Sequence, residues 1–312
     1  MKDPIFVCLA LVFILFFAGC VQPPATTGGQ QPGGAQQPGG PTVVNVTQGQ
    51  QPAGGQAQPP PATPPAQVTV NQTAQQQQGG AQQAASSLSS QEISFTASDN
   101  WKIYGTLYPA KNSKPTIGVI LVPQRGYDRS SFDPLVPVLH DALPDADIVA
   151  LDTRGNGKST NLGTYANFMA GDYRSMVNDV KGATSYLSFY RFVNNYYVVG
   201  SSVGATVAIR YAAQDSAVQK VVMLSPGMSY EGVDIAPALG QVRKEVFIIA
   251  SDNDPQSSFD SQTAYSTSNA PVKKLFLYKT IGPAHGTDMF AASESSSEGK
   301  LTQMISDWLK NS

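Results

Sequence analysis

The most informative part of the sequence is Tyr196-Tyr197-Val198-Val199-Gly200-Ser201-Ser202-Val203-Gly204. It begins as an apolar run that is typical of a buried strand and ends in Gly-x-Ser-x-Gly. Small residues at helical spacing continue from Ala205 to Ala213. If the strand ends at Gly200 and a helix begins at Val203, Ser202 lies on a sharp turn with its hydroxyl exposed. Glycine is needed on both sides because such a turn leaves no room for side chains.

A serine on this kind of turn, called a nucleophile elbow, needs a base to remove its proton, and a histidine oriented by a carboxylate is the usual device. The chain has two histidines. His285 lies in a Gly/Pro loop directly after the last predicted strand, where it would face the strand ends, so we expect it to be the base. His140 lies within a predicted helix among packing positions, and we interpret it as a structural or surface residue.

The carboxylate is expected in Ser251-Asp252-Asn253-Asp254-Pro255, which follows an apolar strand at 246–250. We predict Asp254 as the acid, with Asp252 as the alternative. The predicted nucleophile, acid and base, Ser202, Asp254 and His285, therefore come from three separate loops, each at the end of a strand.

The remaining chain alternates between strand and helix patterns. Two alternating runs, 92–97 and 101–108, are joined by Ser98-Asp99-Asn100 and predict an antiparallel hairpin. Buried strands are expected at 116–122, 146–151, 218–224, 246–250 and 274–278, and helices at 132–143, 172–187 and 301–309. This alternation predicts an α/β fold, a doubly wound, mostly parallel sheet with helices on both faces and ligands at the carboxyl ends of its strands.

From about residue 92 to the C-terminus, the chain resembles the α/β-hydrolase superfamily, on the side of the dienelactone hydrolases and small esterases. The order Ser202, Asp254, His285 is that of the family's nucleophile, acid and base. In addition, Asp152-Thr153-Arg154-Gly155-Asn156-Gly157-Lys158-Ser159 is similar to the family's Asp-x-Arg-Gly-His-Gly-x-Ser loop.

The resemblance also implies an oxyanion hole. By position, its donors would be the backbone N–H groups of Val203 and Arg125, with Gln124 as the alternative to Arg125. Pro123 and Gln124 stand where many relatives have His-Gly, so this loop departs from the family pattern.

The N-terminal residues predict export. An apolar run from Ile5 to Gly19 has roughly the length of a signal-peptide core and is short for a membrane-spanning helix. The run ends in Phe17-Ala18-Gly19 and is followed by Cys20, and these four residues resemble the lipobox of lipoproteins. That resemblance implies that residues 1–20 are a signal peptide with its lipobox. Lipidated Cys20 would then tether the protein to the outer face of the cytoplasmic membrane or to the cell surface.

Residues 21–90 form a Gln/Pro/Gly-rich segment without a single charged or aromatic side chain. Such a composition cannot form a core, so we predict a disordered linker between the anchor and one folded domain at 91–312. Asn45 and Asn71 lie in Asn-x-Thr sequences, which leave open whether the linker carries glycans or is a plain spacer.

Composition excludes several kinds of site. The two cysteines, Cys8 and Cys20, both lie in the signal segment, so the predicted domain has no disulfide, Cys nucleophile or Cys-ligated metal. Two histidines are too few for a multi-His metal site, and we expect no metal or cofactor. The chain has no run of Lys and Arg, and its net charge is −2, so nucleic acid is not an expected partner. We expect a monomer.

Together these features predict a lipid-anchored serine hydrolase that cleaves a small or surface-exposed carboxylic ester through an acyl-enzyme. Peptidase, thioesterase and acyltransferase chemistry use the same residues and remain alternatives. The second hypothesis is a non-catalytic surface binding protein on the same scaffold, for which the altered Pro123-Gln124 loop is the sole support.

Overall fold

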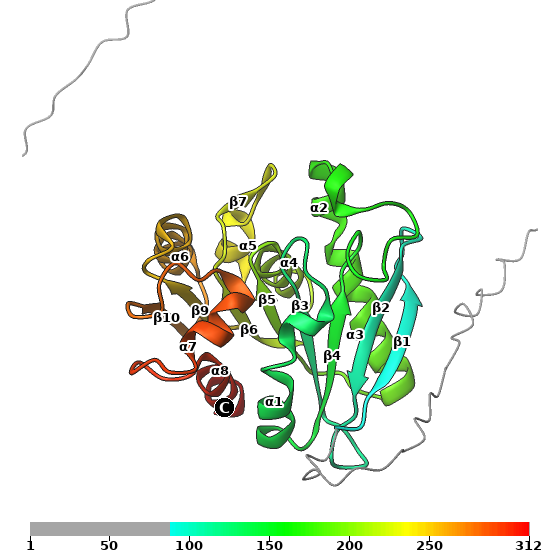
Figure 1. The fold of residues 1–312 in the computed structure, drawn as a ribbon. Coiled ribbons are helices and arrows are strands. Elements are labelled where there is room, and N and C mark those ends of the chain that lie inside the picture. Colours follow the sequence, from blue (N-terminus) through cyan, green and yellow to red (C-terminus); the bar gives the residue numbers. More distant parts are fainter. Residues whose placement is uncertain (1–87, 312) are drawn as a thin grey trace, which may run out of the picture. The chain divides into compact units, whose positions relative to one another are not determined.

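A computed structural model describes residues 88–311, which contain an eight-stranded sheet (Figure 1). The strands are, in spatial order, β1 (Gln91–Thr96), β2 (Lys102–Tyr108), β4 (Ala146–Asp152), β3 (Ile117–Val122), β5 (Tyr196–Ser201), β6 (Val218–Leu224), β9 (Glu245–Ser251) and β10 (Lys273–Tyr278). The β1–β2 and β2–β4 pairs are antiparallel, and the other neighbours are parallel. This confirms the predicted hairpin and the mostly parallel sheet.

Helices cover both faces of the sheet (Figure 1). One face packs against α3 (Val177–Arg191), α4 (Val203–Ala212), α5 (Ala236–Gln241) and α6 (Pro255–Thr267). The other face packs against α1 (Val136–Ala142), α7 (Met289–Ser293) and α8 (Leu301–Lys310). The central strands read as continuous apolar runs because both of their faces are covered: every residue of β4 and of β5 is buried.

Two predicted helices differ from the structure. The helix expected at 132–143 begins at Val136, after a short 3₁₀ turn, Arg129–Phe132. Pro137 fits near the start of a helix, because the N–H groups of the first turn have no partner within the helix and proline's missing N–H therefore costs nothing there. The helix accordingly begins beside it. The helix expected at 172–187 is two helices, α2 (Ala170–Ser175) and α3, which meet at Met176.

Some elements have no counterpart in the sequence-based prediction. They are α5, α6, α7, two 3₁₀ turns (Tyr165–Asn167 and Gly286–Asp288) and a small hairpin of β7 (Ser229–Tyr230) and β8 (Val233–Asp234). The hairpin and α5 lie in the segment between β6 and β9 and form no multi-helix cap.

The predicted signal peptide, the lipobox at Cys20 and the linker up to residue 87 lie outside the described residues, so the proposed division of the chain stays a prediction. No helix of the described part is long and apolar enough to cross a membrane. Within residues 88–311, no three His, Cys, Asp or Glu side chains are grouped closely enough to hold a metal ion.

Parallel strands bring their carboxyl ends to one edge of the sheet. The loops after β3, β5, β9 and β10 carry Gln124, Ser202, Asp254 and His285, respectively. The fold therefore gathers the predicted site residues at this edge.

Candidate active site

Ser202 lies on a sharp turn between β5 and α4, as the sequence predicts. Its backbone has φ 52° and ψ −115°, a conformation that L residues adopt only under strain. Neighbouring backbone explains both glycines of the motif. A Cβ at Gly200 would lie 2.2 Å from Gly204 O, and a Cβ at Gly204 would lie 2.2 Å from Val122 O. The strand, the turn and the helix can approach this closely only without side chains there.

The second feature of the site is a carboxylate–imidazole pair. Asp254 Oδ2 lies 2.7 Å from His285 Nδ1. Asp252 instead accepts a hydrogen bond from Ser258 Oγ at 2.8 Å, and no bond joins it to His285 within the described residues. Of the two predicted acids, the structure thus brings Asp254 to the histidine. The Asp254 side chain is 17% exposed and that of His285 40%, so the pair is open to solvent on the imidazole side.

Ser257, which the sequence analysis missed, is a further partner of this pair. Its Oγ lies 3.1 Å from His285 Nδ1, and its N–H donates to Asp254 Oδ1 at 3.4 Å. Asp254 is the N-cap of α6, so the helix itself fixes the carboxylate. Burial raises the pKa of Asp254, but hydrogen bonds from Ser257 and His285 outweigh burial and hold this pKa below its ordinary value. Asp254 is therefore ionised and able to orient the imidazole.

Gln124 joins three loops of the site. Its buried Oε1 accepts hydrogen bonds from Ser201 Oγ at 2.6 Å, from Thr287 N at 2.9 Å and from Thr287 Oγ1 at 3.3 Å. Ser201 precedes the predicted nucleophile, and Thr287 follows His285 by two positions. The loop after β3 therefore fixes the spacing between the nucleophile strand and the loop of the base. Gln124, which departs from the family pattern, thus holds these two segments at a fixed spacing.

The His285 loop has a further support in Ser225, at the end of β6. Gly286 N donates to Ser225 Oγ at 2.9 Å, and Ser225 N donates to Ile249 O of β9 at 2.8 Å. Ser202 N donates to Leu224 O at 2.8 Å. Backbone hydrogen bonds thus join the ends of β5, β6 and β9, and the Ser225 hydroxyl joins the His285 loop to them.

Two backbone groups remain available as donors. Among the described residues, neither Val203 N–H nor Arg125 N–H donates a hydrogen bond, whereas the following Gly126 N–H donates to Asn156 Oδ1 at 2.9 Å. These are the two N–H groups expected in the oxyanion hole. The Ser202 hydroxyl and His285 Nε2 likewise have no hydrogen-bond partner in the described part, so Ser202 and His285 are not yet bonded to each other. Hydrogen bonds between catalytic groups often tighten only when substrate binds.

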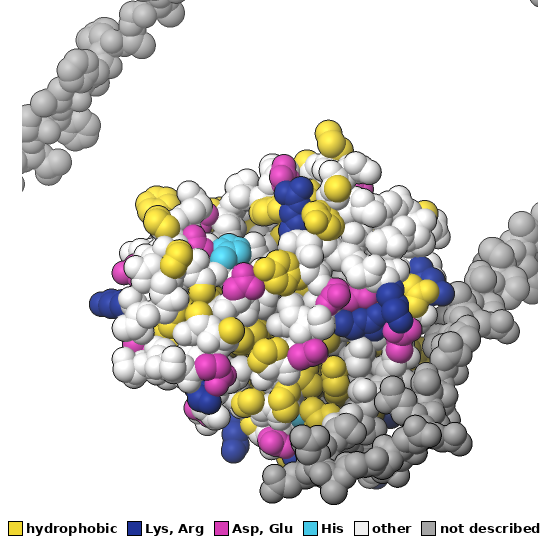
Figure 2. Space-filling view, viewed as in Figure 1, with side chains coloured by type: hydrophobic (Ala, Val, Ile, Leu, Met, Phe, Trp, Pro, Cys, Tyr) yellow, Lys and Arg dark blue, Asp and Glu magenta, His cyan; other side chains and the backbone are white. Residues whose placement is uncertain are grey.

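The rim of the site is polar. Tyr127 Oη donates to Asp288 at 3.1 Å, and a depression of about 390 Å³ lies beside this pair. On the other side, Arg125 Nη1 donates to Tyr230 Oη at 3.4 Å and lies 3.7 Å from the Glu231 carboxylate. The small β7–β8 hairpin therefore reaches the loop after β3. Figure 2 shows a histidine side chain open to the surface with acidic side chains beside it.

Comparisons with known proteins agree with this geometry. Residues 119–248 match the family model described as the alpha/beta hydrolase fold. The chain has an α/β-hydrolase fold. The match covers the loop after β3 and the Ser202 turn and ends before Asp254 and His285. A search of curated protein sequences gives no match.

Solved structures of two esterases and a dienelactone hydrolase are similar in fold. An esterase from Pyrococcus furiosus is 18% identical, with a TM-score of 0.59, over 72% of this chain and 91% of that one. A dienelactone hydrolase from Anabaena variabilis is 19% identical, with a TM-score of 0.56, over 71% and 96%. Acetyl xylan esterase 1 from a Thermoanaerobacterium is 15% identical, with a TM-score of 0.55, over 70% and 83%. At these identities the similarity shows a shared fold.

The other motif that resembles the superfamily, Asp152–Ser159, holds the fold together. Arg154, 1% exposed, donates to Asp179 from Nε at 2.9 Å and from Nη2 at 2.7 Å, and to Asp99 from Nη1 at 2.7 Å. Asp152 accepts from the backbone N–H groups of Arg129 and Lys158. This loop thus ties β4 to α3, to the β1–β2 turn and to the loop after β3.

Proposed function

We propose that the protein is a serine hydrolase of carboxylic esters, in which Ser202 is the nucleophile, His285 the base and Asp254 the residue that orients His285. The observation that supports it best is the 2.7 Å contact between Asp254 and His285 at the edge of the sheet that also carries the strained Ser202 turn. A hydrolase needs these three groups together, whereas a binding protein does not.

In the proposed reaction, Ser202 Oγ attacks the ester carbonyl carbon while its proton passes to His285 Nε2. The N–H groups of Val203 and Arg125 stabilise the negative charge on the carbonyl oxygen. Collapse of this intermediate breaks the ester bond, and His285 returns the proton to the departing alcohol. Water, deprotonated by His285, then attacks the acyl-enzyme, and the acid leaves as Ser202 recovers its proton.

The shape of the site supports small or exposed esters as substrates. The segment between β6 and β9 forms only the β7–β8 hairpin and α5, and the rim is lined by Tyr127, Asp288 and Arg125. The proteins of similar fold include esterases and a dienelactone hydrolase. We further propose that the protein is exported and attached to a membrane through lipidated Cys20, as residues 17–20 predict.

A fluorophosphonate probe tests the catalytic part without knowledge of the substrate, because it reacts with activated serines. We expect the full-length protein to be labelled and Ser202→Ala to remain unlabelled. Hydrolysis of short-chain acyl esters should be lost in the same variant. The neighbouring Ser201→Ala keeps the nucleophile and loses only the bond to Gln124, so it should still be labelled, although more slowly than the parent. A folded parent that is neither labelled nor active would favour the non-catalytic binding protein.

A further inference from the structure

A continuous group of aromatic side chains lies on the outer side of α3, away from the candidate active site. It consists of Phe95, Tyr186, Phe189, Tyr190 and Phe192, here called the aromatic surface. The Phe95 and Tyr186 rings are 6.3 Å apart, Tyr186 and Tyr190 4.8 Å, and Phe189 and Tyr190 4.8 Å. Phe192 is 82% exposed, Phe189 61% and Tyr190 41%. Contiguous exposed apolar groups of this kind mark interaction sites.

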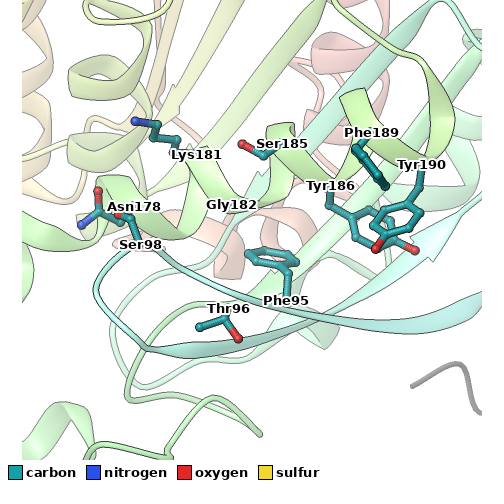
Figure 3. A pocket seen from close by; sticks show the side chains of 10 residues that line it. All are labelled: Phe95, Thr96, Ser98, Asn178, Lys181, Gly182, Ser185, Tyr186, Phe189 and Tyr190. Carbon is teal, nitrogen blue, oxygen red and sulfur yellow. The ribbon is translucent and has the colours of Figure 1, made fainter. Parts of the chain in front are cut away.

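A groove of about 440 Å³ runs between β1 and α3 within this surface (Figure 3). Phe95 points toward the helix from β1, and Tyr186, Phe189 and Tyr190 lie together to one side of it. The one charged side chain that lines the groove is Lys181, and no Asp or Glu lines it. An apolar surface with a lysine and without carboxylates is complementary to the apolar interior and anionic headgroups of a lipid bilayer.

Phe192 stands in an unfavourable backbone conformation. It follows the last residue of α3 with φ 59° and ψ 30°, in the left-handed region where glycine is the usual residue. A phenylalanine there gains nothing from burial, since most of its side chain is exposed. Its presence is explained if the side chain is buried against something outside the domain.

The aromatic surface reaches the end of the sheet at which the described part of the chain begins. Arg191, at the end of α3, donates to Asp147 at the start of β4, with Nε 2.7 Å from Oδ2. β1 begins at Gln91, paired with Leu107, and the next residue of β2, Tyr108, pairs with Ile148 beside Asp147. The described part of the chain therefore begins at the end of the sheet where α3 ends.

We propose that the aromatic surface contacts the lipid bilayer to which the N-terminal segment attaches the protein. The 87 residues that precede the described part include the apolar run at 5–19 and Cys20. The described part begins at the end of the sheet where α3 ends, with Leu88 itself packed on the opposite face, which α1, α7 and α8 cover. Attachment keeps the domain close to the membrane, so even a weak surface contact is populated. Tyrosine is typical of the bilayer interface, and phenylalanine is typical of apolar faces that bury themselves in it.

The proposal orients the domain. Strands of six or seven residues separate the end of α3 from the Ser202 turn, which corresponds to about 20 Å. With the aromatic surface on the bilayer, the site faces away from the membrane. The inference rests on the membrane attachment proposed above and does not depend on the catalytic part.

Tryptophan fluorescence of the full-length protein on vesicles tests this proposal. Phe192→Trp introduces a reporter into the aromatic surface, and Phe259→Trp introduces one at a position 66% exposed on α6 beside the site. The vesicles contain phosphatidylcholine and phosphatidylglycerol brominated near the headgroup. The emission of the parent protein, which comes from Trp101 and Trp308, is subtracted as background. We expect a blue shift and loss of emission for Phe192→Trp, and neither for Phe259→Trp.

Three outcomes would overturn the proposal. The first is protein that floats with the vesicles while the indole at position 192 stays unquenched. In that case the protein is attached to the membrane, but the aromatic surface does not contact the bilayer. The second is protein that does not float with the vesicles at all. The third is a blue shift that grows with protein concentration and is insensitive to brominated lipid, which would assign the aromatic surface to contact with a second copy of the chain.

Discussion

Gly286 approaches Gln124 so closely that a Cβ at position 286 would lie 2.0 Å from Gln124 Oε1 and 2.3 Å from Ser201 Oγ. The residue next to the proposed base is therefore packed directly against the residue that precedes the proposed nucleophile. The two loops can keep this spacing only if position 286 has no side chain.

Gly286→Ala should separate these loops. The methyl group must displace Gln124 or the His285 loop, and the φ of +57° adds strain of about 1–3 kcal/mol. We expect kcat/KM to fall by about 10²-fold, because small displacements of catalytic groups are this costly, and Tm to fall as well. Gly282→Ala is the control, since it has φ +67° with no atom within 4 Å of the added Cβ. Equal losses of activity in both variants would show that strain alone matters.

Gln124→Met keeps the size of the side chain and removes the acceptor. Ser201 Oγ and Thr287 N would then lose their partner in a buried place, which costs about 1–3 kcal/mol in unfolding free energy. We expect kcat to fall more than KM rises, because the substrate does not contact this group. Gln124→Glu retains an acceptor oxygen and should recover part of kcat. An unchanged kcat in Gln124→Met would contradict the assigned positioning role.

Asp254→Asn tests the choice between the two acids. The amide cannot stabilise the imidazolium form of His285, so kcat should fall by about 10⁴-fold, with little change in KM. Asp252→Asn changes a carboxylate that is bonded to Ser258 instead. It should retain activity within a few-fold of the parent. The reverse result would assign the role to Asp252 in the working enzyme.

The lowered pKa of Asp254 predicts a pH-dependent part of stability. Burial raises this pKa, but the bonds from Ser257 and His285 lower it by more, so the folded protein favours the ionised form. The resulting stabilisation is complete above about pH 4, the ordinary value for Asp, and is lost as pH falls through the folded-state pKa. The Tm difference between parent and Asp254→Asn should thus be larger at neutral pH and shrink below about pH 4. A constant difference would contradict this.

Arg154→Met should destabilise the fold without touching the site. It leaves Asp179, which is 0% exposed, as an unpaired buried carboxylate. Breaking a buried pair in this way costs about 3–5 kcal/mol, which is measurable by urea unfolding. The double variant Arg154→Met/Asp179→Leu removes the stranded charge and should be more stable than the single variant. Equal stabilities of parent and single variant would contradict a structural role.

Local patterns suffice for most of the fold. The runs 218–224 and 246–250 are strands in the structure, and the Ser202 turn lies between β5 and α4 as its sequence requires. These elements are encoded by neighbouring residues, namely apolar runs and paired glycines. The helix at 255–267 was missed because its apolar side chains form no clear stripe. The Asp254-Pro255 pair, a good N-cap followed by proline, was the available signal.

The site is less accessible to sequence reasoning because its contacts are not local. The choice of Asp254 over Asp252 depends on which carboxylate the start of α6 turns toward His285. The bonds of Gln124 to Ser201 and Thr287 depend on the spatial neighbourhood of β3, β5 and the His285 loop. No spacing in the sequence predicts these distances. Because each residue lies at the end of a parallel strand, the sequence predicts only that they gather at the same edge of the sheet.

Gln124 bonds to one residue 77 positions away along the chain and to another 163 positions away. Contacts of such high sequence separation form late in folding, because long loops must close first. A chain that has not yet added β10 and the loop after it holds Ser202 without its base. Incomplete or misfolded copies should therefore be inert toward esters, so that the appearance of activity during refolding reports the docking of the last strand.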